Sequence, residues 1–219
     1  MLSRRIVKSW GDPEPSILAK LRMRLRERPT LKAKVSRAIH RLRVQKTRLE
    51  NASLKIERHD KALFDKCVKA QMVKDSARAV MYANECAELR RIAKTTLRCQ
   101  LALEQVLLRL ETIKDFGEVA SLMGPVLNVV QEIKTELSGV MPEVSLELSE
   151  ISDTLGDIVM EIGEAAGVSY DETYPSNEAR KILDEANVVA EQKMKEKFPE
   201  LPLQTSVTVR ESPEADRLK

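Results

Sequence analysis

Apolar residues recur at steps of four and three along ten positions from residue 31 to residue 63, and eight of the ten are apolar. This spacing is typical of one face of a long helix that packs in a coiled-coil-like seam. The side chain of Thr30, directly after Pro29, can cap the start of this helix. Gln45 and His59 are polar exceptions, which either set the register of the seam or are tolerated where it is partly exposed. The seam consists of Leu31, Val35, Ala38, Leu42, Gln45, Leu49, Ala52, Ile56, His59 and Leu63.

The helical pattern loses its apolar residues near Val73 and then resumes as far as about Lys114. Asp75 or Ser76 can cap the second helix. Two helices of about 40 residues joined by a short turn predict an antiparallel hairpin over residues 30–114, about 60 Å long. Small residues near the turn would let the two backbones approach closely. They are Ala77, Ala79, Ala83 and Ala87.

Glycine and proline punctuate the chain after the hairpin, and they are expected to divide residues 115–142 into short helices. The breakers are Gly117, Gly124, Pro125, Gly139 and Pro142. The hairpin and these short helices together form the expected core, over residues 30–141.

Residues 142–163 carry the most regular amphipathic pattern of the chain. Six aliphatic residues step by four and three, and the segment contains acidic residues but no basic residue. An apolar stripe on an acidic helix has to be buried against another part of the protein. The stripe consists of Val144, Leu148, Ile151, Leu155, Ile158 and Ile162.

Residues 164–176 read as a flexible linker, and residues 177–219 as a further helix followed by a tail. This helix is expected to run from about Asn177 to Glu196, with Ile182, Leu183, Val189 and Met194 as its apolar residues. The whole pattern predicts an all-α fold: a long antiparallel hairpin, short helices, an acidic amphipathic helix and a flexible C-terminal tail.

The composition agrees with an elongated helical protein, because 32% of the residues are charged, only 3% are aromatic and only 7 are glycine. The three cysteines lie in helical patterns without a CxxC pair, which fits a reducing cytoplasm. No apolar run approaches the roughly 18 to 20 residues of a membrane span, and no signal peptide is recognisable. A phosphate-binding glycine loop, zinc-ligand spacing and a nucleophile elbow are also missing from the sequence. We therefore expect no enzymatic activity, no cofactor and no metal site.

Charge is sorted along the chain. Residues 1–48 hold 15 basic and 3 acidic side chains, whereas residues 111–191 hold 4 basic and 18 acidic ones. The modest net charge of +3 hides this asymmetry. Such a chain can attract a polyanion with one end, attract its own other end, or stack against copies of itself.

Residues 1–29 form a basic leader in which Leu2, Ile6 and Trp10 recur every four residues. On a helix these three would share one face with cations around it, which is typical of an interfacial membrane anchor. The flanking cations are Arg4, Arg5 and Lys8. A disordered or docked tail is the alternative. Residues 21–26 alternate between apolar and basic, which permits a strand, although the surrounding pattern favours a short helix.

A motif in the tail reads Phe198, Pro199, Glu200, Leu201, Pro202. Its prolines stiffen an extended segment, which can place two apolar side chains in a groove at low entropic cost. The motif resembles the proline-based sequence by which ESCRT-III proteins bind the MIT domain of their remodelling AAA ATPase.

Three segments resemble the helical hairpin of the ESCRT-III (charged multivesicular body protein) family: Ala77-Arg78-Ala79, Tyr82-Ala83-Asn84-Glu85 and Glu88-Leu89-Arg90-Arg91. The run from Leu101 to Leu110 and the segment Val140-Met141-Pro142-Glu143 are similar to the archaeal cell-division branch of that family, CdvB. The resemblance covers about residues 30–160 together with the tail motif.

The resemblance implies a monomer in which an acidic helix folds back onto a basic hairpin, then opens and polymerises into filaments on anionic membranes. Such filaments remodel, constrict or sever membranes in archaeal cell division or vesicle budding. Residues 142–163 are the expected autoinhibitory latch, closed by their apolar stripe. The implied partners are copies of this chain, paralogous subunits, an anionic membrane and a CdvC-like AAA ATPase whose MIT domain binds the tail motif, residues 198–202, within the C-terminal segment 177–219. The implied location is cytoplasmic, peripheral on the inner face of the plasma membrane, at the division site.

Opening of the latch is expected to expose the basic face of the first helix to the membrane, with a solvated helix face as the alternative. This face consists of Lys32, Lys34, Arg37, Arg41, Arg43, Lys46 and Arg48. A coiled-coil protein that binds nucleic acid is a rival, because basic residues attract phosphate of any origin. The basic region has no aromatic residue for base stacking except Trp10, so nucleic acid is not the expected partner. A passive cytoskeletal scaffold is a third interpretation, which accounts for the seams but not for the acidic half or the tail motif.

Overall fold

The structure, a computed structural model, describes residues 30–116, 120–166 and 177–201. Every regular element within these ranges is an α-helix, which confirms the all-α prediction. The helices are α2 (Leu31–Met72), α3 (Ser76–Phe116), α4 (Ala120–Leu137), α5 (Pro142–Ala166) and α6 (Asn177–Lys197). The predicted leader, most of the predicted linker and the end of the tail lie outside the described residues.

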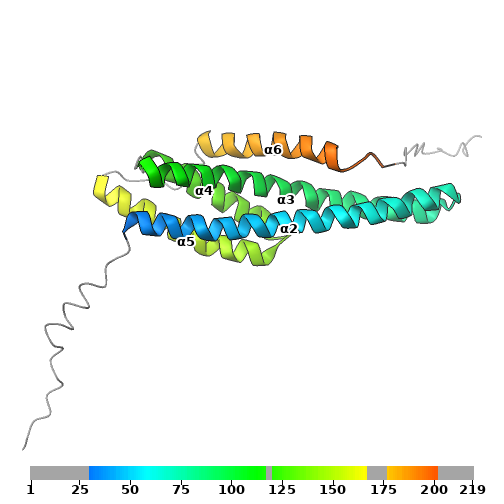
Figure 1. Ribbon diagram of the computed structural model, residues 1–219, viewed down its shortest axis with the longest axis horizontal. Helices are drawn as coiled ribbons and strands as arrows, with labels where there is room; N and C mark the ends of the chain where they lie inside the picture. The colour runs from blue at the N-terminus through cyan, green and yellow to red at the C-terminus, as the bar shows by residue number, and fades with distance from the viewer. Residues whose placement is uncertain (1–29, 117–119, 167–176, 202–219) are drawn as a thin grey trace, which may run out of the picture.

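Helices α2 and α3 form the long antiparallel hairpin that the sequence predicts (Figure 1). Thr30 caps α2 as expected, because its Oγ1 accepts a hydrogen bond from the backbone N–H of Ala33 at 3.3 Å. Asp75 is the residue that caps α3, since its Oδ1 accepts from the N–H of Arg78 at 3.1 Å. The hairpin is therefore fixed at the start of both helices by side-chain caps.

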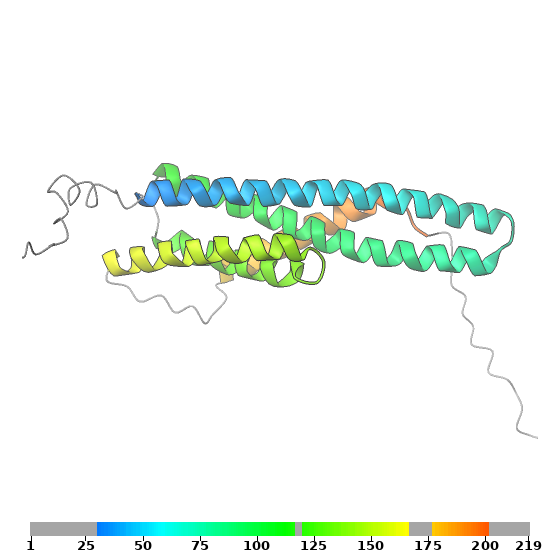
Figure 2. The ribbon, with the colours of Figure 1, turned by 90° about the horizontal axis from the view of Figure 1, so that it is seen from below.

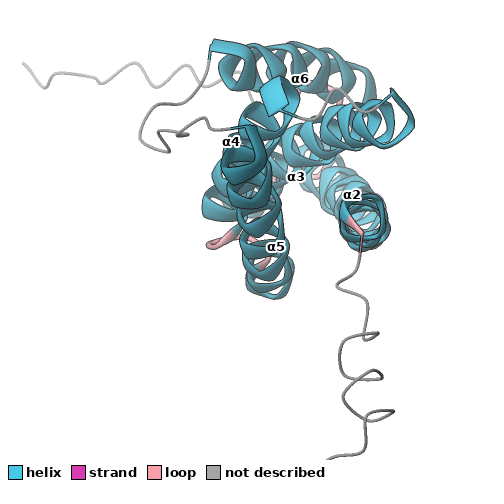
Figure 3. Ribbon diagram, turned by 90° about the vertical axis from the view of Figure 1, so that its left-hand side faces the viewer, coloured by secondary structure: helices cyan, strands magenta, loops and turns pink. Residues whose placement is uncertain are grey.

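The other three helices pack around one half of the hairpin and leave its turn projecting (Figure 2). Helices α4 and α5 form a second antiparallel pair, in which α4 packs on α3 and α5 packs on α2. Helix α6 lies on α3 and also touches α4, so that α3 is enclosed by α2, α4 and α6 (Figure 3).

The core is correspondingly uneven along the hairpin. A large cluster of aliphatic residues joins all five helices at the covered half. Beyond it, a small cluster of Cys67, Ala70, Ala79 and Ala83 holds the distal half together. Ala79 and Ala83 thus occupy the close backbone approach that was predicted, whereas Ala77 and Ala87 face solvent.

The predicted seam of α2 is correct as far as Leu49 and wrong at His59. Gln45 is buried within it, but His59 is exposed and Asp60 is buried instead, with 2% of its surface accessible. The shift has a physical reason, since Arg90 on α3 lies opposite and forms a two-pronged ion pair with the Asp60 carboxylate. A charged residue such as Asp60 can be buried in the seam because the opposite charge of Arg90 compensates it and satisfies its hydrogen bonds.

Helix α4 runs through Gly124 and Pro125, where the sequence predicted a break. Pro125 is the sixth residue of the helix, so that its missing N–H interrupts the backbone ladder only near the N-terminus. Its ring is buried in a helix whose following residues Val126 and Leu127 are also buried, and this packing favours continuation.

Two further predictions need small corrections. Helix α5 continues to Ala166, past the predicted end at Gly163, which is itself buried. On α6, Ile182 is buried as predicted, but Val189 is 40% exposed. Alanines replace it at the interface with α3, because small side chains allow the two helices to approach closely; the buried ones are Ala179, Ala186 and Ala190.

Replacing Asp60 should reveal how much the distal half depends on the ion pair. Asp60→Ala leaves the largely buried Arg90 without its carboxylate, so we expect the free energy of unfolding to fall by about 3 kcal/mol. His59→Ala is the matched control on the adjacent, exposed position, with an expected change within about 0.5 kcal/mol. Urea unfolding followed by circular dichroism measures the free energy of unfolding of both variants. Equal losses of stability in the two variants would contradict the burial of Asp60 in the seam.

Candidate functional site

The apolar stripe of α5 is entirely buried. All six predicted residues, from Val144 to Ile162, are at most 9% exposed, and four of them are completely inaccessible. The stripe packs against α4 and α2, which close over it from two sides. Full burial of an aliphatic side chain contributes about 1.5 to 3 kcal/mol before the cost of ordering it. The stripe is therefore the main attachment of α5.

Ion pairs add to this attachment along one edge of α5. Lys34 Nζ lies 2.5 Å from Glu161, and Arg41 Nη2 lies 2.6 Å from Glu150 and 3.2 Å from Glu147. The hydrogen bond to Glu150 raises the pKa of Arg41. These groups are partly exposed, and pairs of this kind are worth about 0.2 to 1 kcal/mol each. Charge therefore orients α5 on α2, and apolar burial holds it there.

The seven cations predicted as a membrane surface fall into three groups. Lys34 and Arg41 pair with α5, as described above. Arg43 pairs with Glu111, and Lys46 with Glu50 and Glu104, all within the hairpin. The remaining three are exposed; among the described residues Lys32 and Arg37 have no ion-pair partner, and Arg48 donates a hydrogen bond to Gln45. Only two of the seven are thus held by the closed helix α5.

Exposed basic residues extend much further along α2 than the sequence analysis recognised. Ten positions, spaced by three and four, form an uninterrupted stripe on the solvent side of the helix, about 48 Å long. Seven are basic, none is acidic, and all are exposed except the half-buried Arg41. This α2 stripe consists of Arg37, Arg41, Val44, Arg48, Asn51, Lys55, Arg58, Ala62, Lys66 and Lys69. The same three-and-four counting that found the apolar seam would have found it.

The tail motif is docked on the distal half of the hairpin, and Arg90 is at the centre of the contact. Its Nε and Nη2 donate to the two carboxylate oxygens of Asp60 at 2.8 and 3.0 Å, and its Nη1 donates to the carbonyl oxygen of Pro199 at 2.6 Å. The guanidinium carbon lies 5.9 Å from the ring centroid of Phe64 and 5.6 Å from that of Phe198. We call Asp60, Phe64 and Arg90 the tail socket.

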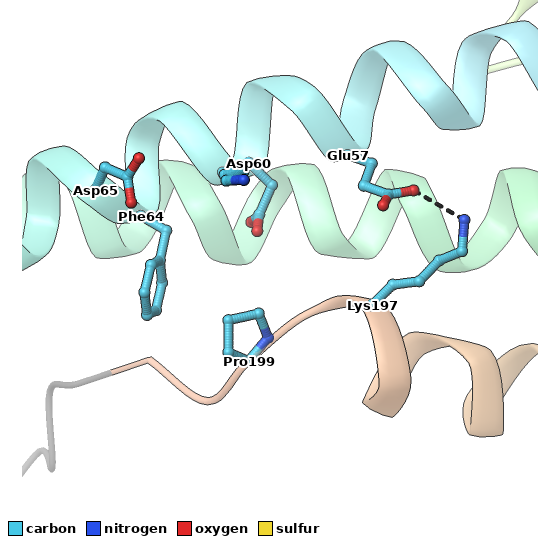
Figure 4. A pocket seen from close by; sticks show the side chains of 7 residues that line it. Glu57, Asp60, Phe64, Asp65, Lys197 and Pro199 are labelled. Carbon is cyan, nitrogen blue, oxygen red and sulfur yellow. Dashed lines mark hydrogen bonds and ion pairs between the residues drawn. The ribbon is translucent and has the colours of Figure 1, made fainter.

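Contacts on both sides of the tail socket extend this docking (Figure 4). Lys197, at the end of α6, pairs with Glu57 of α2 at 2.8 Å. Pro199 lies opposite Phe64 and Asp60 across an open cavity of about 390 Å³. Leu201 is half-buried and packs against the distal core cluster. Sequence reasoning identified the motif but not its socket, because Asp60 and Arg90 are 30 residues apart.

Several predicted residues are not part of these contacts. Glu200 is exposed, and Pro202 lies outside the described residues. The predicted anchor residues Leu2, Arg4, Arg5, Ile6, Lys8 and Trp10 are also outside them.

The three cysteines are buried and unpaired. Burial raises the pKa of Cys86 to about 11 and that of Cys99 to about 12, so both stay protonated and unreactive at neutral pH. Within the described ranges, no acidic, cysteine or histidine side chains gather into a metal-binding group. None of the described helices combines the length and apolarity needed to cross a bilayer.

An all-helical protein built on a long antiparallel hairpin is consistent with the ESCRT-III fold. Two Sulfolobus acidocaldarius proteins are similar along most of this chain. Cell division protein B1 is 46% identical over 202 residues, which are 92% of each chain. Cell division protein B is 34% identical over 162 residues, 74% of this chain and 62% of the relative. The chain therefore belongs to the cell division protein B (CdvB) family, the archaeal branch of ESCRT-III.

A third relative from the same organism, Cell division protein B3, is 28% identical over 120 residues, 53% of this chain and 68% of the relative. No protein-family model and no solved structure matches the chain. Several paralogues of the family thus coexist in one organism, which bears on the choice of partner subunits.

The relative weight of the apolar and ionic contacts of α5 can be measured directly. Ile151→Ala removes buried methyl groups from the centre of the stripe, and we expect the free energy of unfolding to fall by about 3 kcal/mol. Glu150→Gln removes the Arg41 pair at the edge and should cost no more than about 1 kcal/mol. Urea unfolding in low and high salt tests both. A larger loss for Glu150→Gln would mean that charge, rather than apolar burial, holds α5.

Proposed function

We propose that this protein is a subunit of a membrane-remodelling filament that acts in archaeal cell division. Copies of the chain and of its paralogues would assemble on the anionic inner face of the plasma membrane and constrict or sever it at the division site. The relatives named cell division proteins support the process. The main support for membrane binding is the α2 stripe, which has seven cations and no anion.

The α2 stripe suits a flat anionic surface. Each cation near such a membrane is worth about 1 kcal/mol, and the contribution falls off within a Debye length of about 8 Å at physiological ionic strength. A filament repeats the stripe in every subunit, so weak individual contacts add up to firm attachment. Most of the stripe is exposed while α5 is closed, so first contact with lipid does not require opening.

Helix α5 acts in this proposal as the latch that controls assembly. Its release would break the pairs made by Lys34 and Arg41 and would expose both the α5 stripe and the surface that it covers on α2 and α4. Newly exposed complementary apolar surfaces favour association between subunits. An anionic membrane would assist, because its charge competes with Glu147, Glu150 and Glu161 for the same cations.

The tail would recruit the AAA ATPase that disassembles the filament. Phe198, Pro199 and Leu201 are the residues that we assign to the MIT domain. In the closed protein these same residues contact the hairpin. Binding of the ATPase therefore requires that the tail leave the tail socket first.

Removal of residues 143–219 tests the latch. We expect the truncated protein to form filaments and to tubulate phosphatidylglycerol vesicles at concentrations where the full chain stays monomeric, because the surfaces covered by α5 and α6 are then open. Negative-stain electron microscopy and sedimentation velocity record the change, and circular dichroism verifies that the hairpin remains helical. Glu147→Lys with Glu150→Lys, in the full chain, should shift assembly in the same direction. A truncated protein that stays monomeric on the vesicles would rule out the latch.

The proposed competition between the tail socket and the MIT domain for the tail can be tested with matched variants. Phe64→Ala with Glu57→Ala weakens the docking without touching the motif, so binding of the MIT domain should tighten about tenfold. Phe198→Ala or Leu201→Ala should abolish binding. Arg91→Ala, an exposed neighbour of Arg90, is the control and should change nothing. Isothermal titration with the isolated MIT domain gives the affinities, and unchanged affinity for Phe198→Ala and Leu201→Ala would transfer the binding role to α6.

A further inference from the structure

The turn of the hairpin exposes apolar side chains that the proposed function has not used. Met72 is 78% exposed and Val73 is 75% exposed, and both precede Lys74 at the apex. Val80 and Met81, in the first turns of α3, are 46% and 49% exposed. The turn projects beyond α4, α5 and α6, so no described helix other than α2 and α3 lies near it (Figure 1).

Val73 lies in line with the basic α2 stripe. Counting from Arg58, the stripe continues by steps of four, four and three through Ala62, Lys66 and Lys69, and a further step of four reaches Val73. A surface that contacts the stripe along its length therefore meets an exposed valine at the distal end. Val73 thus lies on the same side of the hairpin as the stripe.

The backbone of the turn is well fixed. The N–H of Lys74 donates to the carbonyl of Gln71, and the N–H of Asp75 donates to the carbonyl of Ala70, both at 2.9 Å. Lys74 has a φ of 57°, a left-handed conformation that usually favours glycine at the end of a helix. A lysine at this position costs about 1 kcal/mol more than glycine and adds a cation at the apex.

The charge around the tip indicates which kind of partner the tip fits. Residues 66–81 contain four cations and one anion, and that anion, Asp75, is already paired with Arg78 at 3.3 Å. A basic surface around exposed apolar side chains matches the interface of an anionic bilayer, where phosphate groups surround acyl chains. Nucleic acid would satisfy the cations but would leave Met72 and Val73 in water.

We propose that the turn of the hairpin is a membrane-insertion tip, in which Met72 and Val73 enter the acyl boundary of an anionic bilayer while the α2 stripe lies on its headgroups. The proposal rests on the proposed membrane function and adds a specific site of lipid contact, separate from the leader. The tip then fixes the direction in which each hairpin lies on the surface.

The experiment places an environment-sensitive nitrobenzoxadiazole fluorophore on Val73→Cys in the full chain. Selective labelling is possible because the three native cysteines are buried, and the wild-type chain serves to verify this. Val188→Cys, at a 66% exposed position on α6, is the matched control. On addition of phosphatidylglycerol vesicles we expect a severalfold rise in emission for Val73→Cys, with loss of quenching by aqueous iodide, and no rise for Val188→Cys. An unlabelled Met72→Ser/Val73→Ser variant should bind the vesicles about tenfold more weakly.

The outcomes separate this inference from the function on which it rests. Normal vesicle binding with unchanged emission from Val73→Cys would contradict insertion of the turn but would still agree with the proposed membrane function. Failure of the wild-type chain to bind vesicles would overturn both. High emission before vesicles are added would indicate that the tip contacts the chain's own tail. Emission that rises with protein concentration alone would indicate that the tip contacts a second copy of the chain. Either result would overturn the insertion tip. A response to duplex DNA equal to that for vesicles would also count against lipid insertion.

Discussion

Close packing of α2 against α3 is the contact on which the other features depend. In the covered half it belongs to a five-helix core of aliphatic residues. In the distal half it narrows to alanine and cysteine, which bring the backbones together but bury little apolar area. The Asp60–Arg90 pair also joins the two helices in the distal half, with side chains 3% and 15% exposed. A buried ion pair is weak evidence for added stability, but it fixes the register, because any slip would leave two charges unpaired.

Helix α2 has three distinct faces. The seam of α2 faces α3, one edge pairs with α5 through Lys34 and Arg41, and the α2 stripe faces solvent. The three faces differ in chemistry: the first is mainly aliphatic, the second carries isolated cations opposite the acidic helix, and the third carries a dense row of exposed cations. Arg41 belongs to both the α5 edge and the stripe. In the proposed function, an anionic membrane would compete with helix α5 for this residue.

The sequence predicted what depends on local periodicity and missed what depends on distant partners. The α5 stripe, the caps and the two long helices were correct because each follows from a spacing of three or four residues. Asp60 was missed because its burial depends on Arg90, 30 residues away. Pro125 was interpreted as a break because its neighbours in the fold, which stabilise the helix, are not visible in the local sequence. The α2 stripe was only partly predicted, because the net charge of the chain fades after residue 48, whereas the basic face of the helix continues to Lys69.

The separate positions of these sites suggest an order for the three proposed events, which are membrane contact, release of α5 and release of the tail. The α2 stripe and the turn are largely uncovered in the closed protein, whereas the stripe of α5 is buried and the tail motif is docked. Membrane contact can therefore come first, with closed subunits. Binding to an anionic surface would then draw Arg41 from Glu147 and Glu150, loosening α5 only where lipid is present. The tail is held by Arg90 on the distal half, where α5 does not reach, so its release is a separate event. In the proposed function, assembly and recruitment of the ATPase would then be controlled by different contacts on the same hairpin, which would allow a filament to form before its disassembly begins.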